Sequence, residues 1–319
     1  MKSTFSRSGT LLVQNNAKGP VLAFSEGLSF WGGVDPDFGT IIDTHHPQHG
    51  VSLSGQIVVM PTSRGSCSGS GVLLQLARIG QAPAALVFRE NEDILTLGAI
   101  IAGRLYGCPV AILRLPRQLY NELSLSEIAE IRGSTLMFGG QSISLQQPAS
   151  SVLKLSDEDK EFLEGKRGPA AQVAMEILCR MATAQGADEF TSVSRGHIDG
   201  CILAHEGNLD FAEKMLQMGA KTVIPTTINA ISVDRENWHT QRVIPEFELK
   251  ASRLADAYVK MGVRPTFTCA PYLLADQPDQ DEAIGWSESN AVIYANTVLG
   301  ARTVKRTAIM GHRNGCDIA

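Results

Sequence analysis

The segment SGQIVVMPTSRGSCSGSGVLLQLARIG, residues 54–80, contains the pattern that decides the fold class. Residues 54–60 are rich in apolar and β-branched side chains, which predicts a strand. Residues 66–76 begin with small polar side chains and become apolar at helical spacing, which predicts a helix. A strand, a small-residue loop and a helix in this order are typical of an α/β layer.

The same alternation continues on both sides of this segment. Short apolar runs predict strands, and Gly and Pro residues occupy the turns between them. The predicted strands cover residues 21–24, 40–42, 84–88 and 110–113, and a small-residue helix is predicted at residues 94–106. We therefore expect an α/β unit with a partly parallel sheet in the first half of the chain.

A stretch with one Pro and a Ser pair, residues 146–154, is interpreted as a linker to a second unit. Ser156 and Asp159 have the spacing of a capping box, which predicts a helix start, and another helix is expected from Pro169. Further strands are predicted at residues 190–193, 222–225 and 266–269, and further helices at residues 209–218, 254–261 and 289–298.

The composition is that of an ordinary globular protein. Hydrophobic residues make up 44% and charged residues 19% of the 319 residues, and the formal net charge is -5. This balance argues against a nucleic-acid binder. There is no apolar run of the roughly 20 residues that a membrane helix needs, and the first ten residues do not resemble a signal peptide. We expect a cytoplasmic protein with no membrane or nucleic-acid partner, whose six cysteines are thiols or metal ligands.

The loop Arg64-Gly65-Ser66-Cys67-Ser68-Gly69-Ser70 has the composition of an anion site. Backbone N–H groups at a helix start point outward, and glycines allow a ligand to approach the backbone. A guanidinium beside the loop can bind a carboxylate through two parallel hydrogen bonds. A Ser-rich helix cap without a ligand explains the same spacing, so both interpretations stay open.

The segment Asp43-Thr44-His45-His46-Pro47 suggests a metal site less strongly. Adjacent histidines on an extended strand point to opposite faces and seldom bind one ion. We favour a turn-rich surface segment whose histidines have hydrogen-bond partners.

Polar residues follow three predicted strands of the second half. These segments are Gly196-His197-Ile198-Asp199-Gly200, Pro225-Thr226-Thr227-Ile228-Asn229 and Thr268-Cys269-Ala270-Pro271-Tyr272. Parallel sheets place ligand sites at the carboxyl ends of their strands, so these residues are candidates for one pocket. The alternatives are helix caps and, for Cys269, a small buried apolar side chain. The segment Trp286-Ser287-Glu288-Ser289-Asn290 is a further candidate or an ordinary helix start.

Long motifs in both halves resemble one family. Residues 29–50, SFWGGVDPDFGTIIDTHHPQHG, and residues 64–70, RGSCSGS, are similar to the small subunit of aconitase X. GHIDG, VIPTTIN, TCAPYL and WSESNAVIYANTVLGART are similar to the beginning of its large subunit. The resemblance implies a swivelling β/β/α-type domain at residues 1–147. It also implies an incomplete aconitase-like α/β/α domain at residues 155–319.

The resemblance further implies a hydro-lyase that dehydrates a small hydroxy acid with an iron or iron–sulfur centre. Fused members of the family resemble cis-3-hydroxy-L-proline dehydratase, and split members resemble phosphomevalonate dehydratase. Because the two parts are fused here, cis-3-hydroxy-L-proline is the expected substrate and 5-phosphomevalonate the alternative.

Residue roles follow from the matching motifs. Ser66 is expected to be the base, assisted by Arg64, since a serine alone is too weak an acid to act without help. Cys269 is the expected iron ligand. The residues expected to line the substrate pocket are Gly65, His197, Ile198, Asp199, Thr227, Asn229, Glu288 and Asn290.

The chain departs from the family near its end. Family members continue further, and the tail TAIMGHRNGCDIA, residues 307–319, does not resemble their continuation. A single cysteine cannot hold an iron–sulfur cluster, because such clusters need several thiolates. The alternative expectation is therefore a truncated, catalytically inactive remnant or binding fragment. An incomplete domain also predicts self-association through uncovered surfaces.

Overall fold

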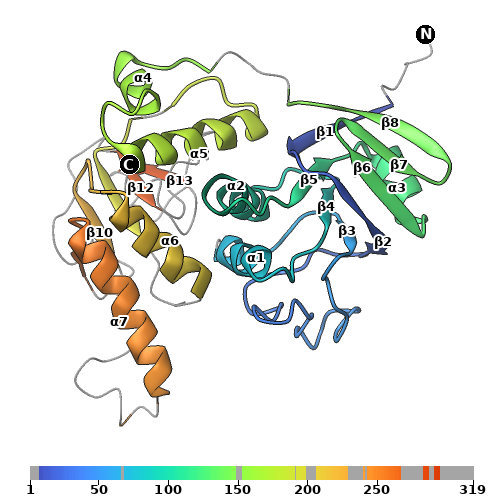
Figure 1. Cartoon of the computed structure of the whole chain (residues 1–319), viewed down its shortest axis with the longest axis horizontal. Helices are drawn as coiled ribbons and strands as arrows, with labels where there is room; N and C mark the ends of the chain where they lie inside the picture. The colour runs from blue at the N-terminus through green and yellow to red at the C-terminus, as the bar shows by residue number, and fades with distance from the viewer. Residues whose placement is uncertain are drawn as a thin grey trace. The chain divides into compact units, whose positions relative to one another are not determined.

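The computed structural model describes residues 7–65, 68–148, 153–190, 192–198, 206–228, 240, 243–266, 283–286 and 291–294. The chain divides into two compact units (Figure 1). The first comprises Met1–Ser151 and Thr183–Gly186, and the second comprises Val152–Ala182 and Ala187–Ala319. Both units contain helices and strands, which confirms the predicted α/β class.

The strands of the first unit form a closed barrel. They are β1 (Ser8–Val13), β2 (Ala17–Ala23), β3 (Ile57–Met60), β4 (Ala85–Phe88), β5 (Ala111–Arg114), β6 (Ile128–Arg132), β7 (Thr135–Phe138) and β8 (Gln141–Gln146). Their order is β1-β5-β4-β3-β2-β6-β7-β8, and the run from β2 to β5 is parallel. The barrel closes where β8 runs parallel to β1, so each of these strands has two neighbours.

Helices pack against this barrel because its central strands are buried on both faces. Ile57 and Val59 of β3 belong to the barrel core, and Val58 and Met60, which point the other way, are equally buried. The helices are α1 (Gly69–Arg78), α2 (Ile94–Tyr106) and α3 (Arg117–Ser124). In Figure 1, α1 and α2 lie side by side. A Cβ on Gly98 of α2 would lie 2.5 Å from the backbone oxygen of Ser70, so glycine allows this close helix contact.

Several predicted boundaries in the first unit were wrong. The strand predicted at residues 54–60 begins only at Ile57, since the preceding residues form a turn. Residues 40–42 contain isolated bridges instead of a strand. The helix predicted from residue 66 begins at Gly69. The antiparallel strands β6, β7 and β8 had no counterpart in the sequence prediction.

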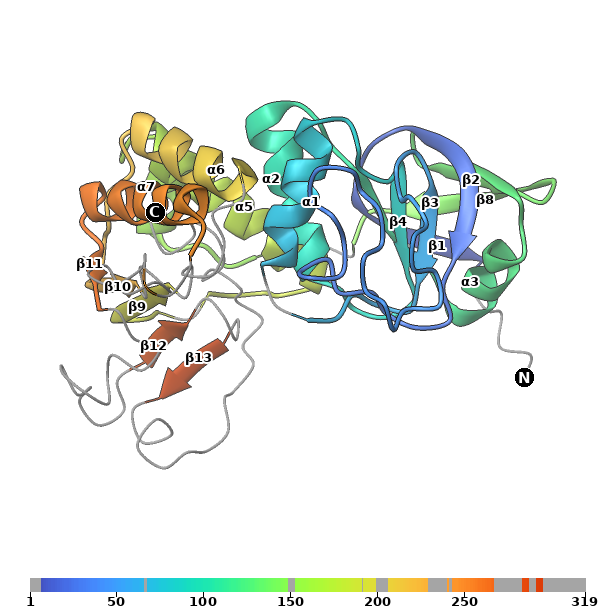
Figure 2. The same ribbon diagram turned by 90° about the horizontal axis from the view of Figure 1, so that it is seen from below.

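The second unit contains a five-stranded sheet in the order β11-β10-β9-β12-β13. Its elements are α4 (Asp157–Leu163), α5 (Pro169–Gln185), β9 (Arg195–Ile198), α6 (Glu206–Gln217), β10 (Thr226–Ile228), α7 (Pro245–Lys260), β11 (Arg264–Pro265), β12 (Ala283–Trp286) and β13 (Ala291–Tyr294). The pairs from β11 to β12 are parallel, and β13 is antiparallel to β12. Helices α6 and α7 pack together on one face of this sheet (Figure 2).

The capping box of Ser156 and Asp159 is confirmed at the start of α4. The strands predicted at residues 190–193 and 222–225 were displaced, because β9 and β10 lie a few residues further along the chain. The strand predicted at residues 266–269 is observed only as β11, before residue 266, and residues 267–269 lie outside the described ranges. Within the helix predicted at residues 289–298, residues 291–294 form strand β13, since β-branched and aromatic side chains favour extended backbone. Among the described residues, no helix is long and apolar enough to cross a membrane.

Candidate functional site

The loop after β3 brings Arg64 and Gly65 against residues that follow β2. The backbone N–H of Arg64 donates to the carbonyl of Leu28, and Arg64 forms a parallel bridge with Ser29. Gly65 has a φ of 88°, and a Cβ there would lie 2.1 Å from the Ser29 Oγ. Glycine is required at this position for its backbone conformation and for the close approach of the two loops.

The Arg64 guanidinium lies between two carboxylates. Its Nη2 is 3.5 Å from Oε1 of Glu26 and 3.5 Å from Oδ2 of Asp43. The backbone N–H of His45 and the charge of Arg64 hold the pKa of Asp43 below its usual value. Arg64 is half-exposed, so its cation is oriented by Glu26 and Asp43 while staying accessible to an anion.

His46 is buried beside this cluster, with only 2% of its surface exposed. Its Nδ1 accepts from the backbone N–H of Gln48, and Phe24 packs edge-on with ring centroids 4.9 Å apart. The Nε2 atom has no hydrogen-bond partner in the part of the chain that the structure describes. The sequence interpretation of a surface position is therefore wrong for His46. The expected surface position is confirmed for the neighbouring His45, whose side chain is 94% exposed.

Two of the predicted pocket residues of the second unit meet across neighbouring strands. His197 of β9 pairs in register with Thr227 of β10, and the His197 Nδ1 lies 2.9 Å from the Thr227 Oγ1. His197 is fully buried, and Ile198 beside it is buried as well. His197 and Thr227 lie within their strands rather than after them, because polar side chains can occupy a buried sheet when they hydrogen-bond each other.

The remaining predicted site residues lie outside the described ranges. They are Ser66, Asp199, Asn229, Cys269, Glu288 and Asn290. Their roles stay predictions. Sequence reasoning did not assign Glu26, Asp43 or His46 to the site, and the signal available for them was the acidic and histidine-rich segment around residue 43.

The described residues do not supply a set of ligands for iron. Within the described ranges, no three His, Cys, Asp or Glu side chains gather closely enough to hold a metal ion. Burial raises the pKa of Cys108 and raises the pKa of Cys179 to about 11.

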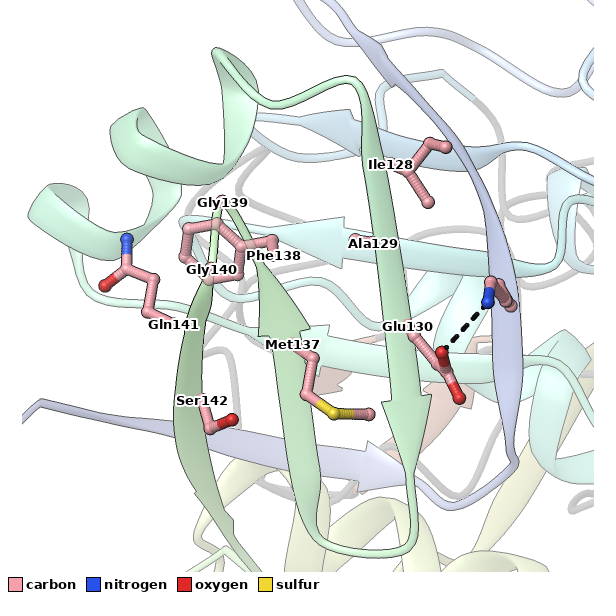
Figure 3. Close-up of a pocket in the computed structure, with 10 residues that line it drawn as sticks. Ile128, Ala129, Glu130, Met137, Phe138, Gly139, Gly140, Gln141 and Ser142 are labelled. Atoms are coloured by element: carbon pink, nitrogen blue, oxygen red, sulfur yellow. Dashed lines mark ion pairs between the residues drawn. The ribbon is translucent and has the colours of Figure 1, made fainter.

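A surface hollow of about 360 Å³ lies elsewhere on the barrel, over β6, β7 and β8 (Figure 3). Ile128 and Met137 line it, and an ion pair of Lys18 with Glu130 lies at its side. None of the predicted site residues lines this hollow. It is therefore separate from the loop that carries Arg64.

Comparison with known protein families covers both units. The sequence profile described as "Aconitase X first domain" matches residues 152–312. The chain belongs to the aconitase X family. The profile described as "Aconitase X swivel domain" matches residues 6–138. The match to the first-domain profile extends to residue 312. The expectation that residues 307–319 do not resemble the family was therefore wrong for residues 307–312.

Curated relatives in the aconitase X family are dehydratases. The chain is 44% identical to the cis-3-hydroxy-L-proline dehydratase of Hypocrea jecorina over 93% of this chain and 52% of that protein. It is 44% identical to the enzyme of the same name from Pseudomonas aeruginosa, over 94% of this chain and 53% of that protein. The large subunit of phosphomevalonate dehydratase from Methanothermobacter thermautotrophicus is 33% identical over 47% of this chain and 38% of that subunit. The chain spans about half the length of the two hydroxyproline dehydratases.

Proposed function

We propose that this chain serves the dehydration of a small hydroxy acid and that cis-3-hydroxy-L-proline is the substrate. The 44% identity to two cis-3-hydroxy-L-proline dehydratases over nearly the whole chain carries the proposal. The reaction removes a proton from the carbon next to the carboxylate and hydroxide from the neighbouring carbon. A carbon–carbon double bond forms, and the hydroxide leaves as water after it gains a proton.

Residues of the first unit supply the binding and proton-transfer groups in this proposal. Arg64 binds the substrate carboxylate, and its half-exposed guanidinium between Glu26 and Asp43 supports that role. Gly65 supports it too, because its lack of a Cβ lets the loop lie against Ser29. Ser66 accepts the proton as the catalytic base, a role that rests on its place in the motif.

Residues of the second unit are proposed to contact the substrate. His197 and Thr227 already hold each other through a buried hydrogen bond, which orients both side chains. Ile198 and the residues outside the described ranges, Asp199, Asn229, Glu288 and Asn290, are assigned to the same pocket by their motifs.

An iron or iron–sulfur centre with Cys269 as one ligand remains a proposal as well. Iron would act as a Lewis acid on the departing hydroxyl group. The residues that the structure describes do not provide the ligand set, so the assignment rests on the motif that contains Cys269. Iron analysis of the purified chain and of a Cys269→Ser variant checks the assignment, and an equal iron content in both would contradict it.

The chain purified with iron present should convert cis-3-hydroxy-L-proline to a dehydrated product detected by mass spectrometry. Ser66→Ala should lower kcat by about 100-fold or more, as expected for loss of a general base. Full activity of the Ser66→Ala variant would remove the base assignment, and no turnover by an iron-loaded wild-type chain would refute the activity proposed for this chain.

The second candidate substrate is 5-phosphomevalonate, favoured by the similarity of residues in this chain to phosphomevalonate dehydratase. It should be assayed alongside under the same conditions. We expect turnover of cis-3-hydroxy-L-proline alone, since identity to the hydroxyproline dehydratases is higher and extends over more of the chain. Turnover of 5-phosphomevalonate alone would reverse the substrate assignment.

A cytoplasmic location and self-association are also proposed. The location is supported by Cys108 and Cys179, neither of which forms a disulfide. The phosphomevalonate dehydratase relatives are named as large and small subunits, which supports association between parts of this kind. Sedimentation velocity of the purified chain checks self-association, and a single monomer peak over a wide concentration range would contradict it.

A further inference from the structure

The chain between β3 and Arg64 is attached to the loop that follows β4. The carbonyl of Pro61 accepts hydrogen bonds from the backbone N–H groups of Arg89 and Glu90, at 3.1 and 3.0 Å. The Thr62 Oγ1 donates to the carbonyl of Asn91 at 3.3 Å. Three successive residues, 61 to 63, thus bond to the loop at residues 89–92, because Ser63 donates to Glu92.

Glu92 differs from the other partners because it is a buried carboxylate, only 6% exposed. Its Oε1 accepts from the Ser63 Oγ at 2.5 Å and from the backbone N–H of Leu95 at 2.7 Å. Its Oε2 accepts from the backbone N–H of Thr96 at 2.9 Å, and the Thr96 Oγ1 lies 2.9 Å from both this Oε2 and the Glu92 carbonyl oxygen. The carboxylate therefore joins the first turn of α2 to the loop after β3, where the positive end of the helix dipole also favours it.

Burial raises the pKa of Glu92, and the hydrogen bonds from Ser63, Leu95 and Thr96 oppose this shift. A buried acidic group with donors on both oxygens has little freedom to move, because any displacement leaves a polar atom unpaired.

Ser63 is the last residue of this segment that bonds to the loop after β4, and the chain then crosses to the residues that follow β2. The next residue, Arg64, bonds through its backbone to Leu28 and carries the guanidinium that lies between Glu26 and Asp43. The position of the Ser63 backbone therefore fixes the position of the adjoining Arg64 backbone, from which the guanidinium side chain extends.

We propose that Glu92 is a positioning residue that acts through Ser63 to hold Arg64 where it receives the substrate carboxylate. This inference rests on the proposed function, in which the Arg64 guanidinium binds the substrate carboxylate. Glu92 does not touch the substrate in this arrangement, and its effect on the reaction passes through the hydroxyl of Ser63.

The test compares Ser63→Ala with Thr96→Val. Each variant removes one hydroxyl that contacts Glu92, but only Ser63→Ala releases the loop, because Thr96 belongs to α2. For Ser63→Ala we expect KM for the substrate to rise about tenfold, the equivalent of one hydrogen bond, with a smaller change in kcat. Thr96→Val should keep the wild-type KM, and Ser63→Thr, which retains the hydroxyl, should restore it.

Hydrogen exchange followed by mass spectrometry provides a readout that does not need turnover. Peptides covering residues 61–65 should exchange about tenfold faster in Ser63→Ala and at the wild-type rate in Thr96→Val. If the wild-type chain is inactive, the proposed function fails, and the exchange rates still decide whether Glu92 holds the loop. Equal KM and equal exchange in the two variants would overturn the inference, since Glu92 would then stabilise the fold alone.

Discussion

Gly65 combines a positive φ of 88° with a backbone so close to Ser29 that a Cβ would lie 2.1 Å from the serine Oγ. The Ser29 hydroxyl is itself held, because it donates to the carbonyl of Trp31 at 2.7 Å. A side chain at residue 65 must therefore displace the loop that Arg64 contacts. The geometry of the candidate anion site depends on this single missing atom.

The variant Gly65→Ala should destabilise the protein and weaken substrate binding. The matched control is Gly80→Ala, because Gly80 has a φ of 74° and a Cβ there would meet no atom within 4 Å. Both variants suffer the backbone strain, and Gly65→Ala should lose about 1–3 kcal/mol more for the steric clash. Urea unfolding and KM measurements check this expectation, and equal unfolding free energies for the two variants would contradict it.

His46 should make the stability depend on pH. Burial lowers the pKa of His46, and the positive charge of Arg64 lowers it further. The carboxylates of Glu26 and Asp43 oppose this shift but do not cancel it. The unfolded chain therefore binds more protons than the folded one as the pH falls below about 6.5, the usual value for histidine. The stability from the neutral ring is present above about pH 6.5 and declines as the pH falls from there toward the lowered pKa.

Urea unfolding between about pH 7.5 and pH 5 measures this dependence. The variant His46→Gln should show a shallower fall in unfolding free energy over this range than the wild type. His45→Gln is the control, because the neighbouring His45 side chain is exposed. An unchanged slope in His46→Gln would show that other groups cause the pH dependence.

At the scale of elements, the pairing of β9 with β10 organises the second unit's candidate residues. Parallel pairing in register sets His197 beside Thr227, and the buried bond between their side chains joins the two strands. The adjacent Thr226 is also buried, but its Oγ1 donates to the carbonyl of Ile224, two residues back along the same chain. Variants of the two threonines can therefore distinguish the effect of a hydrogen bond between strands, at Thr227, from that of a local hydrogen bond, at Thr226.

Thr227→Val should cost about 1–3 kcal/mol of unfolding free energy, because it takes a hydrogen-bond partner from a buried histidine. Thr226→Val, the matched control, should cost less, since the carbonyl it leaves can accept from other donors. In an active enzyme only Thr227→Val should also raise KM, as His197 turns away from its orientation. Equal effects of both variants on KM would argue against a substrate-binding role for the pair.

At the scale of the whole molecule, the first unit has a core of its own. The buried apolar side chains of its barrel come from residues 11–145, and β8 closes the barrel onto β1. A fragment of residues 1–147, the extent predicted from the sequence, contains all of them. The domain boundary itself stays a prediction.

The fragment 1–147 should fold by itself and unfold cooperatively on heating, because the buried apolar side chains of the barrel core all lie within residues 11–145. Far-UV circular dichroism during heating measures this, with near-UV circular dichroism before heating as a check for fixed packing. A shorter fragment of residues 1–138, which lacks β8, should unfold with little cooperativity because the barrel cannot close. Non-cooperative melting of the longer fragment would contradict the predicted boundary.

Local patterns predicted much of the fold. The alternation of β3, α1, β4, α2 and β5 could be predicted because the two periodicities are visible over a few residues. The capping box at Ser156 could be predicted because it involves neighbours only. Strands β6 to β8 were missed although β6 pairs with β7 and β7 pairs with β8 across two-residue turns, so short-range hairpin signals were overlooked there. Long-range pairing decides only their outer contacts, of β6 with β2 and of β8 with β1.

The sequence by itself determined the α/β class, the membership of the aconitase X family and the motif that contains Arg64, since these depend on residue types and spacing along the chain. Only the tertiary structure decided which distant side chains surround that motif. Glu26, Asp43 and His46 reach it from one loop region, and Glu92 reaches it from another through Ser63. The parallel strands β2, β3 and β4 end side by side, and this shared edge of the barrel brings their loops together.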